Sequence, residues 1–422
     1  MIFRTIKAAL VSSALMASAA QAQQVVEWWD FLGGGDGVRM KSLIDQFNTE
    51  HAGEIVIEAT TLEWGIPFYT KVQTSAAVGE GPDIMTYHLS RVPLGVESGA
   101  LSEITADELA SVGLSGDDFA ASNWSAGQID GAQYAIPFDI HAIIMYYNKD
   151  LLGAAGLLDE NGIPVGLDSL EGFNAAMQTL RDNGSDLGVS FQSAGGGTNW
   201  RIFYSLLNQQ AGVFLDEEGN FLAGDNADKA VTAVQTVADW IANGHAQANV
   251  EYPASVALFT GGNAPFHING VWEVPTMTDL HAKGELFEWG AIELPMLFEQ
   301  RATWADSHGF ALPSGGDDPE GRAAALKVIA WMNENSLFWA TAGHIPAYSA
   351  VRDTSDFKDM QPNATYSVLA DAAFFDPVSP LAGVASPVYD AIGNYVYPAI
   401  TGEMSAEDAV ADMIDDLQGQ AY

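Results

Sequence analysis

A long apolar segment runs from Ala135 to Tyr147, and only two polar side chains, Asp139 and His141, interrupt it. Its β-branched and aromatic residues favour a buried strand, which the turn-forming residue Asn148 ends. Asp139 and His141 are two positions apart, so a strand directs both to the same face. A polar pair at one end of a buried strand predicts a site that opens into a cleft.

Helical and strand patterns alternate along the rest of the chain. Residues 25–31 read as a strand, the glycines at 33–35 as a turn, and residues 54–60 as a second strand. Between them lies a helical stripe of Met40, Leu43, Ile44 and Phe47, which Asp36 is placed to cap. A further strand at 83–87 and a helix at about 227–242 continue the alternation. The pattern predicts an α/β protein with β-α-β units.

Composition indicates a large folded protein without a polyanionic partner. The 422 residues, 48% of them hydrophobic, exceed one ordinary domain, so we expect two lobes. Acidic residues outnumber basic ones by 55 to 16, and the formal net charge is −39. Nucleic acids and anionic membranes bind clustered Lys and Arg, so neither is an expected partner.

The first 22 residues have the pattern of a cleavable signal peptide. Arg4 and Lys7 precede an apolar region at 8–20, and Ala20-Gln21-Ala22 supplies a small-residue cleavage site. The chain contains no cysteine, which excludes disulfides, a thiol nucleophile and a lipid-modified cysteine. We therefore expect a free protein in the periplasm of a Gram-negative bacterium.

Several short segments resemble one known family. They are Ile136-Pro137, the run Tyr146-Tyr147-Asn148-Lys149-Asp150, Gly81-Pro82-Asp83-Ile84, Gly270-Val271-Trp272 and Gly343-His344-Ile345-Pro346. These segments are similar to those of the periplasmic extracellular solute-binding proteins (family 1) of carbohydrate ABC importers, which include glucose-binding and glycerol-3-phosphate-binding branches. The resemblance extends over the whole mature chain.

The resemblance implies a two-lobed periplasmic binding protein fold (type II). Each lobe would be a mainly parallel sheet flanked by helices, with three crossings between the lobes. The first lobe would hold residues 23–138 and 296–345, and the second residues 139–295 and 346–422. The second crossing would then follow the segment 292–295.

The implied function is the capture of a sugar, an oligosaccharide or a glycoside in the cleft and its delivery to the membrane permease of an ABC importer. We expect a monomer that is not an enzyme and that uses no cofactor or metal. The chain has no Gly-x-Ser-x-Gly segment, and its eight histidines show no metal-ligand pairing at helical spacing.

Sugar binding requires flat aromatic faces together with amides, carboxylates and imidazoles that bind hydroxyl groups. Alternation along the strand sends one of Trp28 and Trp29 to the core and the other towards the cleft, and we favour Trp29 for the cleft. Trp272 follows a glycine at a strand end, whereas Trp240, Trp331 and Trp339 lie in helical stripes and are expected in the core. The complete set of candidate ligand-binding residues is Trp29, Trp64, His88, Asp139, His141, Trp200, Asn269, Trp272, Asp306, His308 and His344.

Three other ligand or activity classes remain open. A glycerol-3-phosphate, glycerophosphodiester or other anionic sugar derivative would require arginines, but residues 379–387, where such relatives carry one, have none. Arg201 and Arg352 are the possible substitutes. A secreted glycoside hydrolase would require two facing carboxylates, and no particular pair is nominated. A polysaccharide-adhesion protein would present an exposed aromatic strip without a cleft.

Overall fold

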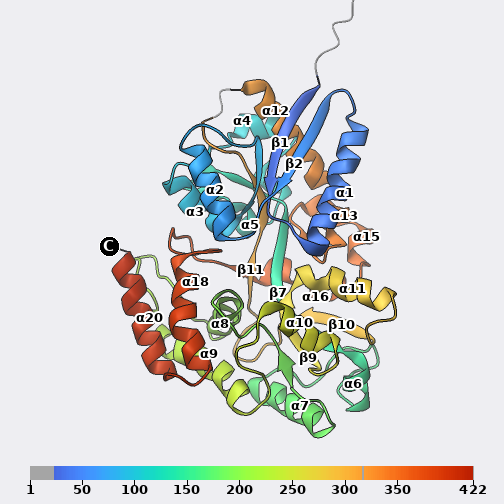
Figure 1. The fold of residues 1–422 in the computed structure, drawn as a ribbon, viewed down its shortest axis with the longest axis vertical. Coiled ribbons are helices and arrows are strands. Elements are labelled where there is room, and N and C mark those ends of the chain that lie inside the picture. Colours follow the sequence, from blue (N-terminus) through green and yellow to red (C-terminus); the bar gives the residue numbers. More distant parts are fainter. Residues whose placement is uncertain (1–22, 316–317, 422) are drawn as a thin grey trace, which may run out of the picture.

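The computed structural model describes residues 23–315 and 318–421. The predicted signal peptide over residues 1–22 lies outside the described residues. The chain forms two lobes, with the first sheet in the upper lobe and the second below it, and strand β7 begins at their junction (Figure 1). This confirms the predicted two-lobed α/β fold.

The first sheet contains the two strands predicted at the start of the chain. Its order is β2 (Ile55–Thr61), β1 (Gln24–Asp30), β3 (Ile84–His88), β12 (His308–Ala311) and β6 (Ala135–Pro137). Strand β1 pairs in parallel with β2 and β3, whereas β12 runs antiparallel to β3 and β6. Alternation along β1 buries Trp28 and leaves Trp29 partly exposed, as predicted from the pattern.

The second sheet is built around β7 (Asp139–Asn148), whose ten residues are all buried. Its order is β14 (Ala373–Phe375), β11 (Thr303–Asp306), β7, β9 (Phe266–Gly270) and β8 (Val189–Ser190), and β10 (Trp289–Glu293) and β13 (Ile345–Pro346) also pair with β7. All four partners of β7 run antiparallel to it. The prediction of mainly parallel sheets is therefore wrong around β7, because this strand enters the lobe from the junction and does not follow a helix of the second lobe.

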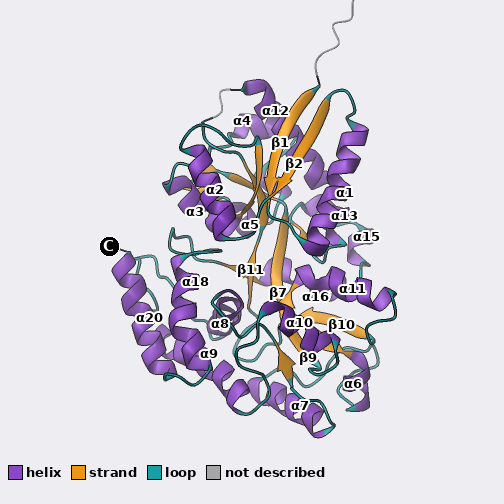
Figure 2. Cartoon of the chain, in the orientation of Figure 1, coloured by secondary structure: helices purple, strands orange, loops and turns teal. Residues whose placement is uncertain are grey.

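Helices surround the sheets in both lobes (Figure 2). Those packed in the first lobe are α1 (Gly34–Glu50), α2 (Ile66–Ala76), α3 (Val92–Glu97), α4 (Ala106–Ser111), α5 (Ala121–Ser125), α12 (Pro319–Glu334) and α13 (Ser336–Ala340), together with the hairpin β4 (Gln128–Ile129) and β5 (Ala132–Gln133). Those between β7 and β10 are α6 (Lys149–Ala154), α7 (Leu170–Asp182), α8 (Gly197–Gln209), α9 (Asn226–Ala242), α10 (Tyr252–Thr260) and α11 (Val274–Ala282). Those after the last crossing are α14 (Ser349–Arg352), α15 (Ser355–Lys358), α16 (Asn363–Tyr366), α17 (Leu369–Ala372), α18 (Pro387–Ala391), α19 (Tyr397–Ile400) and α20 (Ala406–Gln420). Among the described helices, none has the length and apolar character needed to cross a membrane.

The chain crosses between the sheets at three places. It leaves the first sheet between β6 and β7, returns at Ser307 between β11 and β12, and leaves again near β13. The return was predicted after Pro295, which is too early. The reason is Gln209 at the end of α8: its buried amide donates to the carbonyls of Pro295 and Ala302 and accepts from the N–H of Leu297. These bonds hold the segment after β10 on the second lobe.

Candidate functional site

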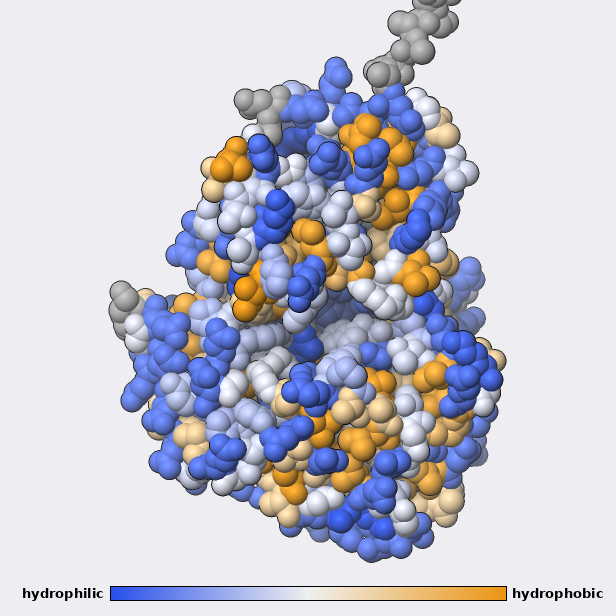
Figure 3. All heavy atoms as spheres, in the orientation of Figure 1, coloured by the Kyte–Doolittle hydropathy of each residue, from blue (hydrophilic) through white to orange (hydrophobic). Residues whose placement is uncertain are grey.

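The candidate site lies where strand ends from both sheets meet below a groove between the lobes. The space-filling view shows this hollow between the upper and lower halves of the molecule (Figure 3). His88 ends β3 and His308 begins β12, and the two are directly opposite in the antiparallel register. Asp306 ends β11 and lies opposite His141 of β7. The register thus brings together polar residues that are far apart in the sequence.

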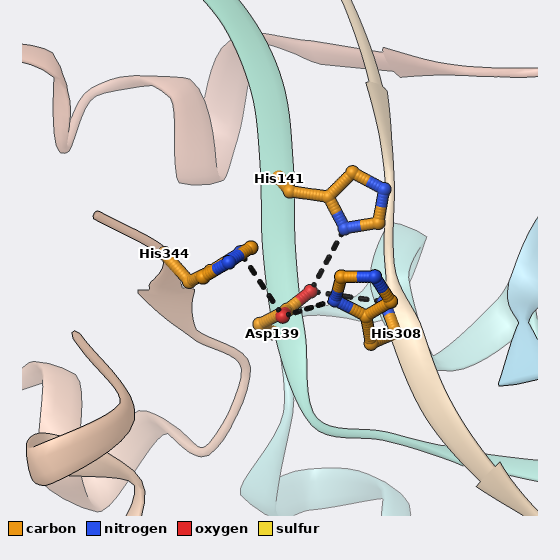
Figure 4. A group of neighbouring side chains, drawn as sticks. All are labelled: Asp139, His141, His308 and His344. Atoms are coloured by element: carbon orange, nitrogen blue, oxygen red, sulfur yellow. Dashed lines mark hydrogen bonds and ion pairs between the residues drawn. The ribbon is translucent and has the colours of Figure 1, made fainter. Parts of the chain in front are cut away.

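The centre of the group is the carboxylate of Asp139, which is completely buried. Three imidazole rings surround it (Figure 4), with Nδ1 of His308 at 2.8 Å, Nδ1 of His141 at 3.1 Å and Nδ1 of His344 at 3.1 Å from its oxygens. The backbone N–H of His308 and the indole N–H of Trp339 also donate to it, at 2.9 and 2.7 Å. Burial alone would raise the pKa of Asp139, but the interactions with His308, His344 and His141 hold it well below its ordinary value. Asp139 is therefore ionised and orients the rings.

His344 joins Asp139 to the first lobe. Its Nε2 lies 3.1 Å from a carboxylate oxygen of Asp36 in α1, and its ring stacks on Trp339 with centroids 4.7 Å apart. Burial lowers the pKa of His344, but the carboxylates of Asp36 and Asp139 outweigh burial and raise it. The two carboxylates thus favour the protonated form of the ring. Asp36 was predicted as a helix cap, but it makes no capping bond and instead binds this ring.

His88 and His141 are neutral rings at the floor of the groove. Nδ1 of His88 is 2.6 Å from the hydroxyl of Tyr69, and the His88 ring stacks on Phe31 at 4.5 Å. Burial, followed by the proximity of His308, lowers the pKa of His88 well below its ordinary value and that of His141 to about 3. Each ring therefore carries one N–H and one free lone pair.

A row of four aromatic rings crosses the floor from one lobe to the other. The ring centroids are 6.2 Å apart between Trp64 and His88, 5.7 Å between His88 and His141, and 5.9 Å between His141 and Trp272. Trp64 follows β2 and is 46% exposed, whereas Trp272 lies in the short turn after β9 and is partly buried. Tyr252 accepts the indole N–H of Trp272 at 2.8 Å. Two tryptophans, one from each lobe, therefore stand at the ends of the row.

Asp306 is a second buried carboxylate, in addition to Asp139, and it lies beside this row of rings. It accepts hydrogen bonds from the N–H and hydroxyl of Ser90, at 3.1 and 2.5 Å, and from the N–H of Ser307 at 2.7 Å. Burial raises the pKa of Asp306 to about 6 despite these bonds. Burial and the nearby charge of Asp306 raise the pKa of Asp376 to about 7.

Three other predicted site residues lie apart from the row of rings. Trp200 has no exposed surface, stacks on Tyr204 at 4.7 Å and donates to Asp376, so it belongs to the core of the second lobe. Trp29 is partly exposed with the ammonium of Lys71 at 5.1 Å from its ring. Asn269 is buried in β9, where its side chain contacts His267 and accepts the N–H of Gly270.

The site also contains residues outside the set of candidate ligand-binding residues. Tyr69, Phe31 and Ser90 support the histidines and Asp306. The guanidinium of Arg201 lies 4.8 Å from the ring centroid of Trp272 and 4.6 Å from that of Trp304. These contacts join segments that are distant in sequence, and no local pattern marks them.

A different pocket lies on the second lobe alone. Its lining includes Tyr147, Lys149, His281, Trp289 and Gln361. None of the predicted site residues contributes to the lining of this pocket. The groove between the lobes is therefore the candidate site.

Gly270 controls the position of Trp272, and its replacement by alanine is expected to displace that ring. A Cβ added at Gly270 would lie 2.1 Å from Cη2 and Cζ3 of Trp272, which is far inside contact distance. We expect a loss of about 1–3 kcal/mol in the free energy of unfolding and a changed near-UV circular dichroism spectrum. Gly153→Ala is the matched control, because its added Cβ meets only Leu158 at 3.7 Å within a helix. Equal behaviour of the two variants would show that the ring is not fixed by Gly270.

Comparison with known proteins identifies clear relatives. The family model described as bacterial extracellular solute-binding protein matches residues 42–365. Maltodextrin-binding protein MdxE of Bacillus subtilis is 22% identical over 346 residues, covering 80% of this chain and 77% of that protein. The maltotriose-binding protein of Pyrococcus abyssi is 22% identical over 327 residues, covering 74% and 65%.

Solved structures show the same fold. The GacH receptor of Streptomyces glaucescens superposes with a TM-score of 0.79 at 18% identity, covering 94% of this chain and 98% of that one. Maltose-bound MalE3 of T. maritima gives a TM-score of 0.78 at 22% identity, covering 94% and 99%.

Proposed function

The chain belongs to the bacterial extracellular solute-binding protein family, and on this basis we propose that it captures a malto-oligosaccharide or a related oligosaccharide between its lobes for an ABC importer. The relatives described above are named for binding maltodextrin and maltotriose. The observation that carries the proposal is the row of rings from Trp64 to Trp272, which spans the floor between the lobes.

In this proposal the exposed ring of Trp64 stacks on a sugar face, and Trp272 borders the ligand from the second lobe. Sugars bury their C–H surfaces on aromatic rings in sites that are otherwise lined by a few polar groups. His88 and His141 form the floor, while Asp139, Asp306, His308 and His344 hold the floor in place. Trp200 is left out of this site because it is wholly buried in the core.

An anionic ligand is a weaker candidate, because the guanidinium groups of both arginines considered for it already have partners within the protein. The guanidinium of Arg201 is enclosed by Trp272 and Trp304. Arg352 donates to the carbonyls of Pro346 and Ala347. A glycoside hydrolase gains no support from the relatives, whose names describe binding.

We further propose that sugar binding draws the lobes together about the three crossings and that the closed form engages the permease. Closure of two domains about a few connecting residues is the usual response of such proteins to ligand. Export to the periplasm by a cleavable signal peptide over residues 1–22, and action as a monomer, complete the proposal. The lobes would divide at Phe138, Ser307 and Ile345.

Trp64→Ala tests the proposal. Removal of a ring that stacks on sugar should weaken maltotriose binding by about 2 kcal/mol, or roughly 30-fold, in isothermal titration calorimetry. The melting temperature without ligand should change little, because the ring is half exposed. Trp331→Ala is the control: this ring packs between α12 and α1 and donates to Glu50. Full affinity of the Trp64 variant, or an equal loss in both variants, would refute the assignment.

A further inference from the structure

We propose that His88, His141 and Asp306 form a binding site for a divalent transition-metal ion of the Zn²⁺ type at the floor of the groove. Each of the three residues offers one ligand atom, and the three atoms lie within 4.8 Å of one another. They lie on three strands: His88 ends β3, Asp306 ends β11, and His141 is the third residue of β7. Two imidazoles and one carboxylate on one side of an ion, with the other positions open, is an established arrangement for such metals.

Each of the three candidate ligands already has the supporting contact that metal ligands require. Nδ1 of His88 is bonded to Tyr69, and Nδ1 of His141 to the carboxylate of Asp139. Nε2 is thus the available ligand atom of each ring, and in the described part of the chain it has no hydrogen-bond partner. Asp306 is held by Ser90 and Ser307. Metal-binding histidines usually donate their other N–H to a carboxylate or similar acceptor, and metal-binding carboxylates are themselves hydrogen-bonded.

Several buried carboxylates lie close to the proposed ligands. The carboxylates of Asp139, Asp306 and Asp376 are buried within this region, where the guanidinium of Arg201 and the imidazoles of His308 and His344 face them. The net charge of −39 on the whole chain further favours the approach of cations.

A second set, Asp139, His141, His308 and His344, also has its ligand atoms within 4.8 Å of one another. We assign it a supporting role. The oxygens of Asp139 already accept from the backbone of His308 and from Trp339, and Figure 4 shows the rings directed at this carboxylate. His344 is paired with Asp36 as well. An ion in this set would have to displace these hydrogen bonds.

The sequence did not predict this metal site. From the sequence we expected a protein that uses no metal, and the present proposal replaces that expectation. The three ligands are distant in sequence, so helical spacing could not reveal them. Only the strand register, which places Asp306 opposite His141, brings them together. The open coordination positions would accept water or a sugar hydroxyl, but the metal site itself does not require a sugar.

The test is titration of the chelator-treated full-length mature protein with ZnCl₂, by calorimetry and by thermal melting. We expect one equivalent to bind and the melting temperature to rise. His88→Ala and Asp306→Asn should each weaken Zn²⁺ binding by at least about 10–100-fold. His281→Ala is the control and should bind as the parent does, because His281 lies on α11 and contacts Glu288 at the surface.

Three outcomes would overturn the proposal: no stoichiometric binding, equal binding by His88→Ala and the parent, or loss of binding in His344→Ala but not in His88→Ala. Circular dichroism of each metal-free variant establishes that it is folded. If a variant is not folded, X-ray absorption of the Zn²⁺-loaded parent decides, since the site requires two imidazole nitrogens and oxygen ligands. Maltotriose titrations of the same samples test the sugar proposal separately.

Discussion

Replacing Asp139 with alanine is expected to lower the free energy of unfolding by about 3–5 kcal/mol. The variant would leave the N–H groups of His308 and Trp339 without their acceptor, and it would leave the buried ring of His344 with Asp36 as its one remaining carboxylate partner. Unpaired buried donors and charges are among the most destabilising defects known in proteins. Urea unfolding followed by far-UV circular dichroism measures the effect.

Asp45→Ala is the control for this prediction. Asp45 lies exposed on α1, where it pairs with Lys41 four residues earlier, and its loss should stay within about 0.5 kcal/mol. If Asp139→Ala cost no more than this control, the carboxylate would not be the centre of the hydrogen-bond network described here.

Trp200→Ala is expected to destabilise the protein by about 3–5 kcal/mol while leaving maltotriose affinity within a factor of about three. The ring is wholly buried against Tyr204 and Phe214, so its removal leaves a cavity in the second lobe. Trp64→Ala should behave in the opposite way, with altered affinity and retained stability. If Trp200→Ala kept its stability but lost sugar binding, Trp200 would be a ligand-binding residue as the sequence first suggested.

The sequence predicted the fold well because its longest apolar segment contains the central strand of the second sheet. The apolar run after Asp139 became β7, all of it buried, and the polar pair at its start became the centre of the site. His88 and His308 were nominated by resemblance, and their antiparallel register explains why they meet. Local pattern and family resemblance therefore agree for the floor of the groove.

Trp200 shows where local pattern misleads. Trp200 was predicted to bind ligand, but helix α8 begins at Gly197 and is buried on every side, including Trp200 and Arg201. A helix buried all round has no polar face that would reveal its position. The sequence alone could not distinguish such a helix from one that borders a cleft.

Long-range hydrogen bonds account for the other differences. The pairing of Asp36 with His344 joins the start of the first lobe to the third crossing, and the amide of Gln209 holds the segment after β10. In each case the hydrogen-bonding partner is far away in the sequence, so the residues next to Asp36 or Gln209 do not reveal it. Such contacts follow from the fold and can be assigned only after the fold is known.

Small-angle X-ray scattering during a titration with maltotriose tests the central claim most directly. If the oligosaccharide binds between the two lobes and draws them together, the radius of gyration should fall as the protein becomes saturated. A radius of gyration that stays constant throughout the titration would contradict capture of this sugar between the lobes.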